Sequence, residues 1–273
     1  MPDALARPSD TPAAALRPPS RHVLGVRFDA TTYADATARI LAWAAAGESR
    51  TVFCSNTHSV IEAHDSPAFA AVLARADLNT PDGVPVVWTL RRRGLEHAER
   101  VYGPDLTLHV LRAAAAASVP VAFYGASEAT LAALADRLPA LAPGLDVRAM
   151  ISPPYRALTA EEDAAYTSQI AASGARLLFV GLGCPRQETW CEAHRGRIPA
   201  VMLAVGAAFD FHAGRVRQAP PALQRMGLEW AFRLAMEPRR LWRRYANVVP
   251  RFLLGVAREE AGMARTPSVD RRL

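Results

Sequence analysis

The sequence predicts an α/β fold, with a mostly parallel sheet, helices on both faces and an all-helical C-terminal appendage. Two observations support this prediction. Short apolar or β-branched runs alternate with helical patterns as far as Ala213, which is typical of parallel strands joined by helices. After Ala213 only helical patterns continue, and arginine becomes the dominant charged residue.

The elements follow in order along the chain. The candidate strands are short apolar runs, expected over residues 23–26, 51–54, 76–78, 121–124, 147–150, 177–180 and 200–205. Several candidate helices open with Ser, Thr or Pro and carry acids in the first turn; we expect helices over residues 32–46, 59–74, 104–117, 128–138, 160–173 and 185–194. In the appendage, Pro238 and Pro250 are expected to divide the helical pattern into short segments.

These patterns divide the chain into four regions. We expect a disordered lead over residues 1–22, the α/β core over 23–213, the appendage over 214–262 and a disordered tail over 263–273. The lead lacks the apolar stretch of a signal peptide, and no run approaches the roughly 18 apolar residues of a spanning helix. The three cysteines form no Cys-x-x-Cys pair. We therefore expect a cytoplasmic protein whose membrane contact is peripheral.

Positive charge is concentrated in the appendage. The whole chain carries +6, whereas the nine arginines and two acids of residues 215–251 alone give +7. The arginines are Arg215, Arg217, Arg225, Arg233, Arg239, Arg240, Arg243, Arg244 and Arg251. Because large apolar and aromatic residues lie between them, the segment suits an anionic, partly apolar surface, and we expect a membrane-associated anionic substrate.

All 32 basic residues are arginine, and lysine does not occur. Its absence excludes Schiff-base catalysis and the phosphate-binding lysine of a P-loop. Phosphate recognition would therefore depend on guanidinium groups, which bind phosphate through two parallel hydrogen bonds. Genomic base bias explains the lack of lysine equally well, but it does not explain why the arginines cluster.

The first candidate loop is the segment Asn-Thr-Pro-Asp-Gly at residues 79–83, which follows a short strand. Ligands of such sheets bind beyond the carboxyl ends of the strands, so Asp82 would face the crevice. A partly desolvated carboxylate at this point accepts a proton from a hydroxyl nucleophile. The alternative is that Pro-Asp-Gly forms a plain turn, for which it is a common sequence.

The second loop, Gly-Leu-Gly-Cys-Pro-Arg-Gln-Glu at residues 181–188, resembles a dinucleotide fingerprint but lacks its third glycine, because Arg186 stands there. Its glycines, Gly181 and Gly183, leave backbone N–H groups and a helix start open to an anion. Arg186 and Gln187 would then bind a diphosphate or a sugar. The alternatives are a solvated Gln187 and a small buried Cys184.

Two further strand ends carry polar residues. Asp210 either binds a sugar hydroxyl or caps the following helical segment. The turn at Gly125 and Ser127 fits either a nucleotide-phosphate contact or a helix cap at Ser127. No HExxH, GxSxG or Asp-x-Asp motif occurs, so no metal is indicated.

Together, five segments resemble the WecG/TagA/CpsF family of glycosyltransferases in order and spacing. They are residues 56–58, 76–88, 101–106, 179–188 and 228–233, and the resemblance extends over about residues 23–255. It implies an inverting, metal-independent and cofactor-free hexosyltransferase of cell-surface polysaccharide or teichoic-acid-type polymer synthesis. The implied donor is UDP linked to N-acetylmannosamine, N-acetylmannosaminuronate or glucose. The implied acceptor is a sugar on undecaprenyl diphosphate at the inner face of the membrane.

The resemblance also assigns roles to residues. Asp82 aligns with the general base and Asn56 with an active-site asparagine. Arg233, Arg240 and Arg243 align with arginines of the C-terminal appendage that close over the active site at the membrane and bind the acceptor and the diphosphate. The expected donor-binding residues are Thr57, Gly83, Gly125, Gly181, Gly183, Arg186, Gln187 and Asp210. Cys54 departs from the family pattern, which has threonine there in many members, so any role of that hydroxyl passes to Ser55 or Thr57.

Two other functions fit parts of the sequence. A nicotinamide-dependent oxidoreductase would explain the fold and the Gly-x-Gly turn, but not the arginine-rich appendage. A non-enzymatic module that binds anionic ligands would explain the appendage alone. We expect no nucleic-acid partner, and the sequence leaves a homo-oligomer open.

Overall fold

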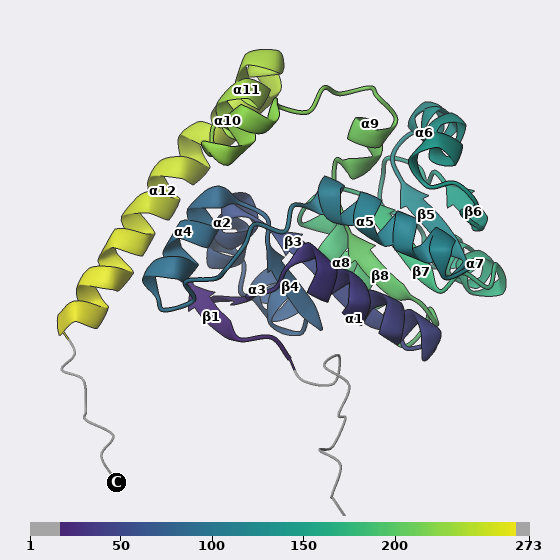
Figure 1. Cartoon of the computed structure of the whole chain (residues 1–273), viewed down its shortest axis with the longest axis horizontal. Coiled ribbons are helices and arrows are strands. Elements are labelled where there is room, and N and C mark those ends of the chain that lie inside the picture. The colour runs from purple at the N-terminus through teal and green to yellow at the C-terminus, as the bar shows by residue number, and fades with distance from the viewer. Residues whose placement is uncertain (1–16, 266–273) are drawn as a thin grey trace, which may run out of the picture.

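The structure is a computed structural model that describes residues 17–265, apart from the side chains at positions 221, 225, 240 and 263–265. Its centre is a six-stranded parallel sheet with the strand order β4-β3-β8-β7-β5-β6 (Figure 1). The strands are β3 (Arg50–Ser55), β4 (Leu78–Pro81), β5 (Val121–Gly125), β6 (Val147–Ile151), β7 (Leu177–Gly181) and β8 (Val201–Ala204). The predicted fold class is confirmed.

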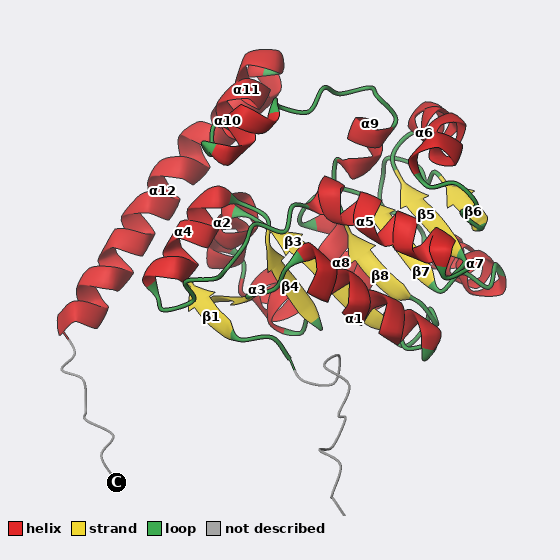
Figure 2. Ribbon diagram, viewed as in Figure 1, coloured by secondary structure: helices red, strands yellow, loops and turns green. Residues whose placement is uncertain are grey.

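Helices cover both faces of the sheet (Figure 2). One face carries α1 (Tyr33–Ala45), α5 (Gly103–Ala116), α6 (Glu128–Leu141) and α9 (Ala208–His212). The other carries α2 (Thr57–Asp65), α3 (Pro67–Ala74), α7 (Ala160–Ala172) and α8 (Arg186–Ala193). Side chains along each strand alternate between these two hydrophobic cores: Val52 and Cys54 face the first, and Phe53 faces the second.

The N-terminal strand prediction was wrong. Residues 23–26 form the turn of an antiparallel hairpin, β1 (Ser20–Val23) and β2 (Val26–Asp29), which lies outside the main sheet. Leu24 and Gly25 both have positive φ, +49° and +82°, as a two-residue hairpin turn requires. The hairpin begins at Ser20, inside the segment predicted to be a disordered lead. Residues 1–16 lie outside the described part of the chain.

Two helix predictions also differ from the structure. The segment 59–74 is not one helix but α2 and α3, because Ser66 ends the first and caps the second by accepting the Phe69 N–H at 3.3 Å. Pro67 then occupies the first helical position of α3, where proline is favoured. Helix α4 (Val84–Arg92) was not predicted, since only its apolar start was noted.

The appendage contains α10 (Pro221–Arg225), α11 (Glu229–Met236) and α12 (Pro238–Arg265). The expectation that Pro250 divides the helical pattern was wrong, because α12 continues through it. A proline removes one helical hydrogen bond, and tertiary packing offsets that loss here. Val248, Phe252 and Val256 of α12 are buried in the same core as α2. The second half of α12 is therefore an integral part of the main domain.

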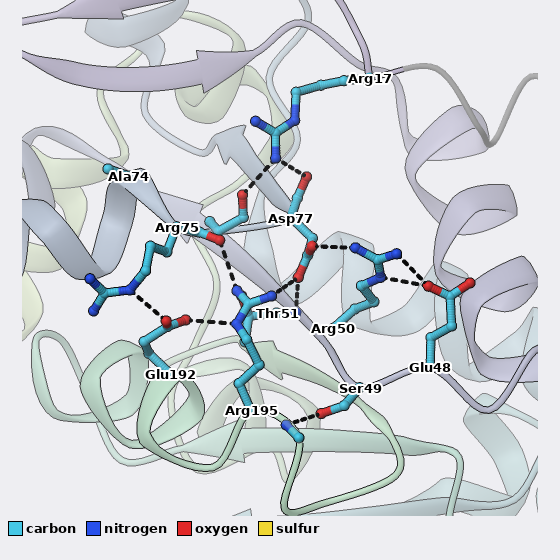
Figure 3. A network of polar contacts seen from close by, with 12 residues as sticks. Arg17, Glu48, Ser49, Arg50, Thr51, Ala74, Arg75, Asp77, Glu192 and Arg195 are labelled. Atoms are coloured by element: carbon cyan, nitrogen blue, oxygen red, sulfur yellow. Dashed lines mark hydrogen bonds and ion pairs between the residues drawn. The ribbon is translucent and has the colours of Figure 1, made fainter.

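The amino ends of β3 and β4 are joined by a polar network around Asp77 (Figure 3). Arg50 Nη1 and Arg195 Nη1 lie 2.8 and 2.6 Å from the two Asp77 carboxylate oxygens. Arg195 also donates to Thr51 Oγ1 at 2.6 Å and to Glu192 at 3.0 Å. This network fixes the start of both strands and lies at the end of the sheet opposite the candidate site.

Candidate active site

Asp82 lies directly after β4, an edge strand, and its side chain is 13% exposed. Its Oδ2 accepts a hydrogen bond from the N–H of Gly103, the first residue of α5, at 3.0 Å. Burial raises the pKa of Asp82 to about 6, although Arg100 and the Gly103 N–H act in the opposite direction. A carboxylate with this pKa is suited to accept a proton from a hydroxyl group near neutral pH.

Arg100 lies between Asp82 and a second carboxylate, Glu229 of α11. Its Nε donates to the backbone carbonyl of Asp82. Its Nη2 lies 2.6 Å from Glu229 Oε2 but 3.9 Å from Asp82 Oδ1. The guanidinium carbon lies 4.1 Å from the centre of the Tyr102 ring, within cation–π distance. Sequence reasoning missed both charged residues, although Arg100 directly precedes a family segment and Glu229 is one of two acids among nine arginines.

Asn56 and Thr57 lie close to the loop that carries Asp82. Asn56 Oδ1 accepts the His58 N–H at 2.9 Å and so caps α2, of which Thr57 is the first residue. A Cβ on Gly83 would lie 3.3 Å from Asn56 Cβ and 3.7 Å from Thr57 N. The structure therefore brings these three predicted residues together beside Asp82.

Gly125 and Gly181 end two adjacent strands, β5 and β7, whose following helices leave on opposite faces of the sheet. Gly125 has φ of +119°, and a Cβ there would lie 2.6 Å from the backbone of Gly181. The Ala126 N–H donates to the Gly181 carbonyl at 3.1 Å. Glycine is thus required at Gly125 for the two loops to meet. In α/β sheets, ligands bind at such switch points.

Gln187 is 4% exposed and joins two loops, so it is not a solvated first-turn residue. Its Oε1 accepts the backbone N–H groups of Gly183 at 3.0 Å and Gly206 at 3.1 Å. Its Nε2 donates to Glu188 Oε1 at 2.9 Å. These bonds fix the turn that follows β7 against the turn that follows β8. Gly183, with φ of +80°, lies within the fixed turn.

Glu188 itself is buried, and burial raises its pKa to about 7. Its Oε2 has no hydrogen-bond partner within the described residues. Arg186, the first residue of α8, has its guanidinium carbon 5.3 Å from the centre of the Tyr155 ring. Arg186 and Leu182 line a cavity of about 590 Å³ beside β5 and α8.

Asp210 lies inside α9, which is capped by Ala207, so the alternative that Asp210 caps this helix was wrong. Asp210 Oδ1 instead accepts a hydrogen bond from Thr130 Oγ1 at 3.3 Å. Ser127 caps α6 by accepting the Thr130 N–H at 3.2 Å, as one alternative predicted. Asp210 therefore lies beside the start of α6 and the loop of Gly125.

Of the three predicted acceptor-binding arginines, the structure brings Arg233 close to Asp82. Burial dominates the pKa of Asp82, and the charge of Arg233 acts in the opposite direction. Arg233 lies 5.6 Å from the centre of the Phe211 ring, and its buried Nε has no partner among the described residues. Arg243 is exposed over Trp242, and the side chain of Arg240 lies outside the described part of the structure.

Metal ligands do not gather in the described part of the chain: no three His, Cys, Asp or Glu side chains there are placed to hold an ion. Likewise, within residues 17–265 no helix is both long and apolar enough to cross a membrane.

A parallel sheet with a desolvated carboxylate, arginines and glycine turns at its carboxyl edge is suited to an enzyme that transfers a group from a phosphorylated substrate. Residues 21–266 match the glycosyl transferase WecG/TagA/CpsF family. The chain is also 33% identical over 215 residues to the N-acetylglucosaminyldiphosphoundecaprenol N-acetyl-beta-D-mannosaminyltransferase of Bacillus spizizenii, covering 78% of this chain and 81% of that relative. The chain belongs to the WecG/TagA/CpsF family, and the prediction of a hexosyltransferase is confirmed.

Proposed function

We propose that this enzyme transfers N-acetylmannosamine from its UDP donor to N-acetylglucosamine on undecaprenyl diphosphate, with inversion and without a metal ion. The name of the Bacillus relative supports this choice among the donors that the sequence left open. The observation that carries the proposal is Asp82, a mostly buried carboxylate with a raised pKa at the carboxyl edge of the sheet.

In the proposed reaction, Asp82 accepts the proton of the acceptor hydroxyl as that oxygen attacks the anomeric carbon of the donor. One carbon–oxygen bond forms to the acceptor while the bond from the anomeric carbon to the diphosphate breaks, and UDP leaves with the electron pair. Asn56, across the loop from Asp82, orients the donor sugar. Arg233 supplies positive charge where the leaving diphosphate becomes more negative, the role that a metal ion has in other transferases.

The nucleotide end of the donor would bind at the crevice between β5 and β7. Backbone groups of Gly125, Gly181 and Gly183 border this crevice, and Asp210 is placed to bind a ribose hydroxyl. Along the sheet the crevice lies between the third and fourth steps from β4, each step being about 4.8 Å, so roughly 17 Å separate it from Asp82. An elongated nucleotide-sugar that lies along the edge would have its anomeric carbon near Asp82.

The appendage would hold the lipid-linked acceptor at an anionic membrane. Trp242 and Leu253 of α12 are 53% and 57% exposed, and their spacing of eleven residues places them on one side of the helix. Arg239 and Arg243 are exposed on the same part of α12. Arginine beside exposed aromatic and aliphatic side chains is suited to the surface of an anionic bilayer.

The test is transfer by the purified full chain, with UDP-N-acetylmannosamine and an undecaprenyl-diphosphate N-acetylglucosamine acceptor, scored by the mass of the lipid product. We expect Asp82→Asn to lower kcat by roughly 10² or more while UDP affinity is kept. Asp146→Asn, at an exposed carboxylate that pairs with Arg148, is the matched control and should retain activity. Near-normal turnover by Asp82→Asn would rule out Asp82 as the base, and transfer only from UDP-N-acetylmannosaminuronate or UDP-glucose would overturn the donor assignment.

A further inference from the structure

Glu229 connects the appendage to Asp82. None of the residues of α11 is fully buried, yet the Glu229 side chain at its start is only 13% exposed. Its Oε2 lies 2.6 Å from Arg100 Nη2, and the Arg100 side chain is 19% exposed. Because packing of buried apolar side chains does not hold α11, this enclosed ion pair is a main contact between α11 and the loop before α5.

Arg100 lies near two carboxylates, those of Asp82 and Glu229, and forms its short ion pair with Glu229. Its Nε is held by the Asp82 carbonyl and its plane lies over Tyr102, so the guanidinium has little freedom. Asp82 Oδ1 lies 3.9 Å from Nη2, about 1 Å beyond the length of a charge-assisted hydrogen bond. Without the Glu229 charge, a small movement of Nη2 would pair Arg100 directly with Asp82.

The other groups that face Asp82 do not provide a negative charge that could hold Arg100 in place of Glu229. From α11 they include Arg233, and from β3 and α1 they include Cys54 and Tyr33. Burial raises the pKa of the Cys54 thiol to about 12 and raises that of the Tyr33 hydroxyl as well, so both are neutral in the working range. Tyr102 is neutral too, because burial raises its pKa. The charges that act on Asp82 are therefore those of Arg100, Arg233 and Glu229.

We infer that Glu229 is a positioning residue that holds Arg100 away from Asp82 and so keeps Asp82 a competent base. A direct Arg100–Asp82 pair would stabilise the carboxylate and weaken it as a proton acceptor. The inference rests on the proposed function, in which Asp82 takes the proton of the acceptor. Since Glu229 belongs to the appendage, Asp82 is fully basic only when α11 is seated against the core.

The experiment compares the titration of Asp82 in the wild type and in Glu229→Gln. The carboxyl stretching band of Asp82 is obtained as the infrared difference between each protein and its Asp82→Asn counterpart, and the pH profile of kcat/KM is measured in parallel. We expect the midpoint of Glu229→Gln to fall by about one pH unit or more, because Arg100 pairs with Asp82. In Glu229→Asp, which keeps the charge, the titration midpoint of Asp82 should return most of the way to the wild-type value.

Two controls make the result specific. Glu259→Gln removes another contact of the appendage, the ion pair with Arg93 at 2.9 Å, and should leave the midpoint unchanged. In an Arg100→Gln background, Glu229→Gln should shift the midpoint by less than half as much. An unchanged midpoint in Glu229→Gln, or an equal shift without Arg100, would overturn the inference. The two proposals can fail separately, because the infrared titration measures Asp82 itself. Normal transfer by Asp82→Asn would refute Asp82 as the base, whereas the infrared midpoints of Asp82 would still decide whether Glu229 holds Arg100 away from it.

Discussion

Glu188 makes folding stability depend on pH in a direction opposite to that of most acidic residues. The residue is 1% exposed, and burial raises its pKa from 4.5 to about 7. Between these values the native protein binds a proton that the unfolded chain has released. The free energy of unfolding therefore falls as pH rises through this window. A change of about 2.5 pKa units corresponds to about 3 kcal/mol of stability that is present below about pH 4.5 and lost above about pH 7.

Glu188→Gln removes this titration but keeps an oxygen that can accept the Gln187 amide. We expect the variant to become more stable relative to the wild type as pH rises, so that the difference in free energy of unfolding grows by roughly 2 to 3 kcal/mol between about pH 5 and pH 8. Urea unfolding followed by tryptophan fluorescence at intermediate pH values measures this difference. Asp146→Asn, at an exposed site, should show no such trend. A difference between Glu188→Gln and the wild type that does not change with pH would refute the assigned pKa.

Three further predictions concern substrates and the membrane. Gly183→Val should raise the dissociation constant for UDP, because valine disfavours the φ of +80° and would displace the turn that borders the nucleotide crevice. Calorimetry checks this against Gly174→Ala, a positive-φ glycine in the turn after α7. Transfer should be unaffected by EDTA, whereas inactivation by EDTA that magnesium reverses would contradict a metal-free reaction. Trp242→Ser combined with Leu253→Ser should reduce flotation with vesicles that contain acidic phospholipid, and equal flotation of variant and wild type would contradict docking through α12.

The structure changes how the appendage can be tested. Sequence patterns placed one boundary at residue 214, which invites truncation there. However, Val248, Phe252 and Val256 beyond that boundary are buried in the core with α2. Gly255 is so close to the hairpin turn that a Cβ there would lie 2.9 Å from Leu24 Cδ1. Removing them would leave cavities in the main domain, at a cost of several kcal/mol. Substitutions on the exposed side of α12 therefore separate membrane docking from folding, and truncation does not.

The positions of site residues at the ends of strands could be predicted from the sequence, because a parallel sheet brings the carboxyl ends of its strands together. Asp82, Asn56 and Gly181 each follow an apolar run, and parallel strands bring their carboxyl ends to one edge. The roles of side chains within the loops were not predictable in the same way. The interior bonds of Gln187 depend on the separation of two turns, 3.0 and 3.1 Å from its oxygen, which no sequence period encodes. The hairpin at Leu24 was missed because the apolar run Val-Leu-Gly-Val was read as one strand across its turn.

The position of Asp82 at an edge strand explains why the site needs residues from the far end of the chain. A carboxylate in the middle of the sheet has loops from strands on both sides, whereas β4 pairs with a strand of this sheet on one side only. Glu229 and Arg233 of α11 lie near Asp82 and contribute to its electrostatic surroundings. Arg100 and Glu229 are 129 residues apart, so their pairing depends on where α11 lies and not on local sequence. The surroundings that set the pKa of Asp82 therefore have two sources. One is the turn that carries Asp82, which the sequence pattern reveals; the other is α11, whose position is determined only in the folded chain.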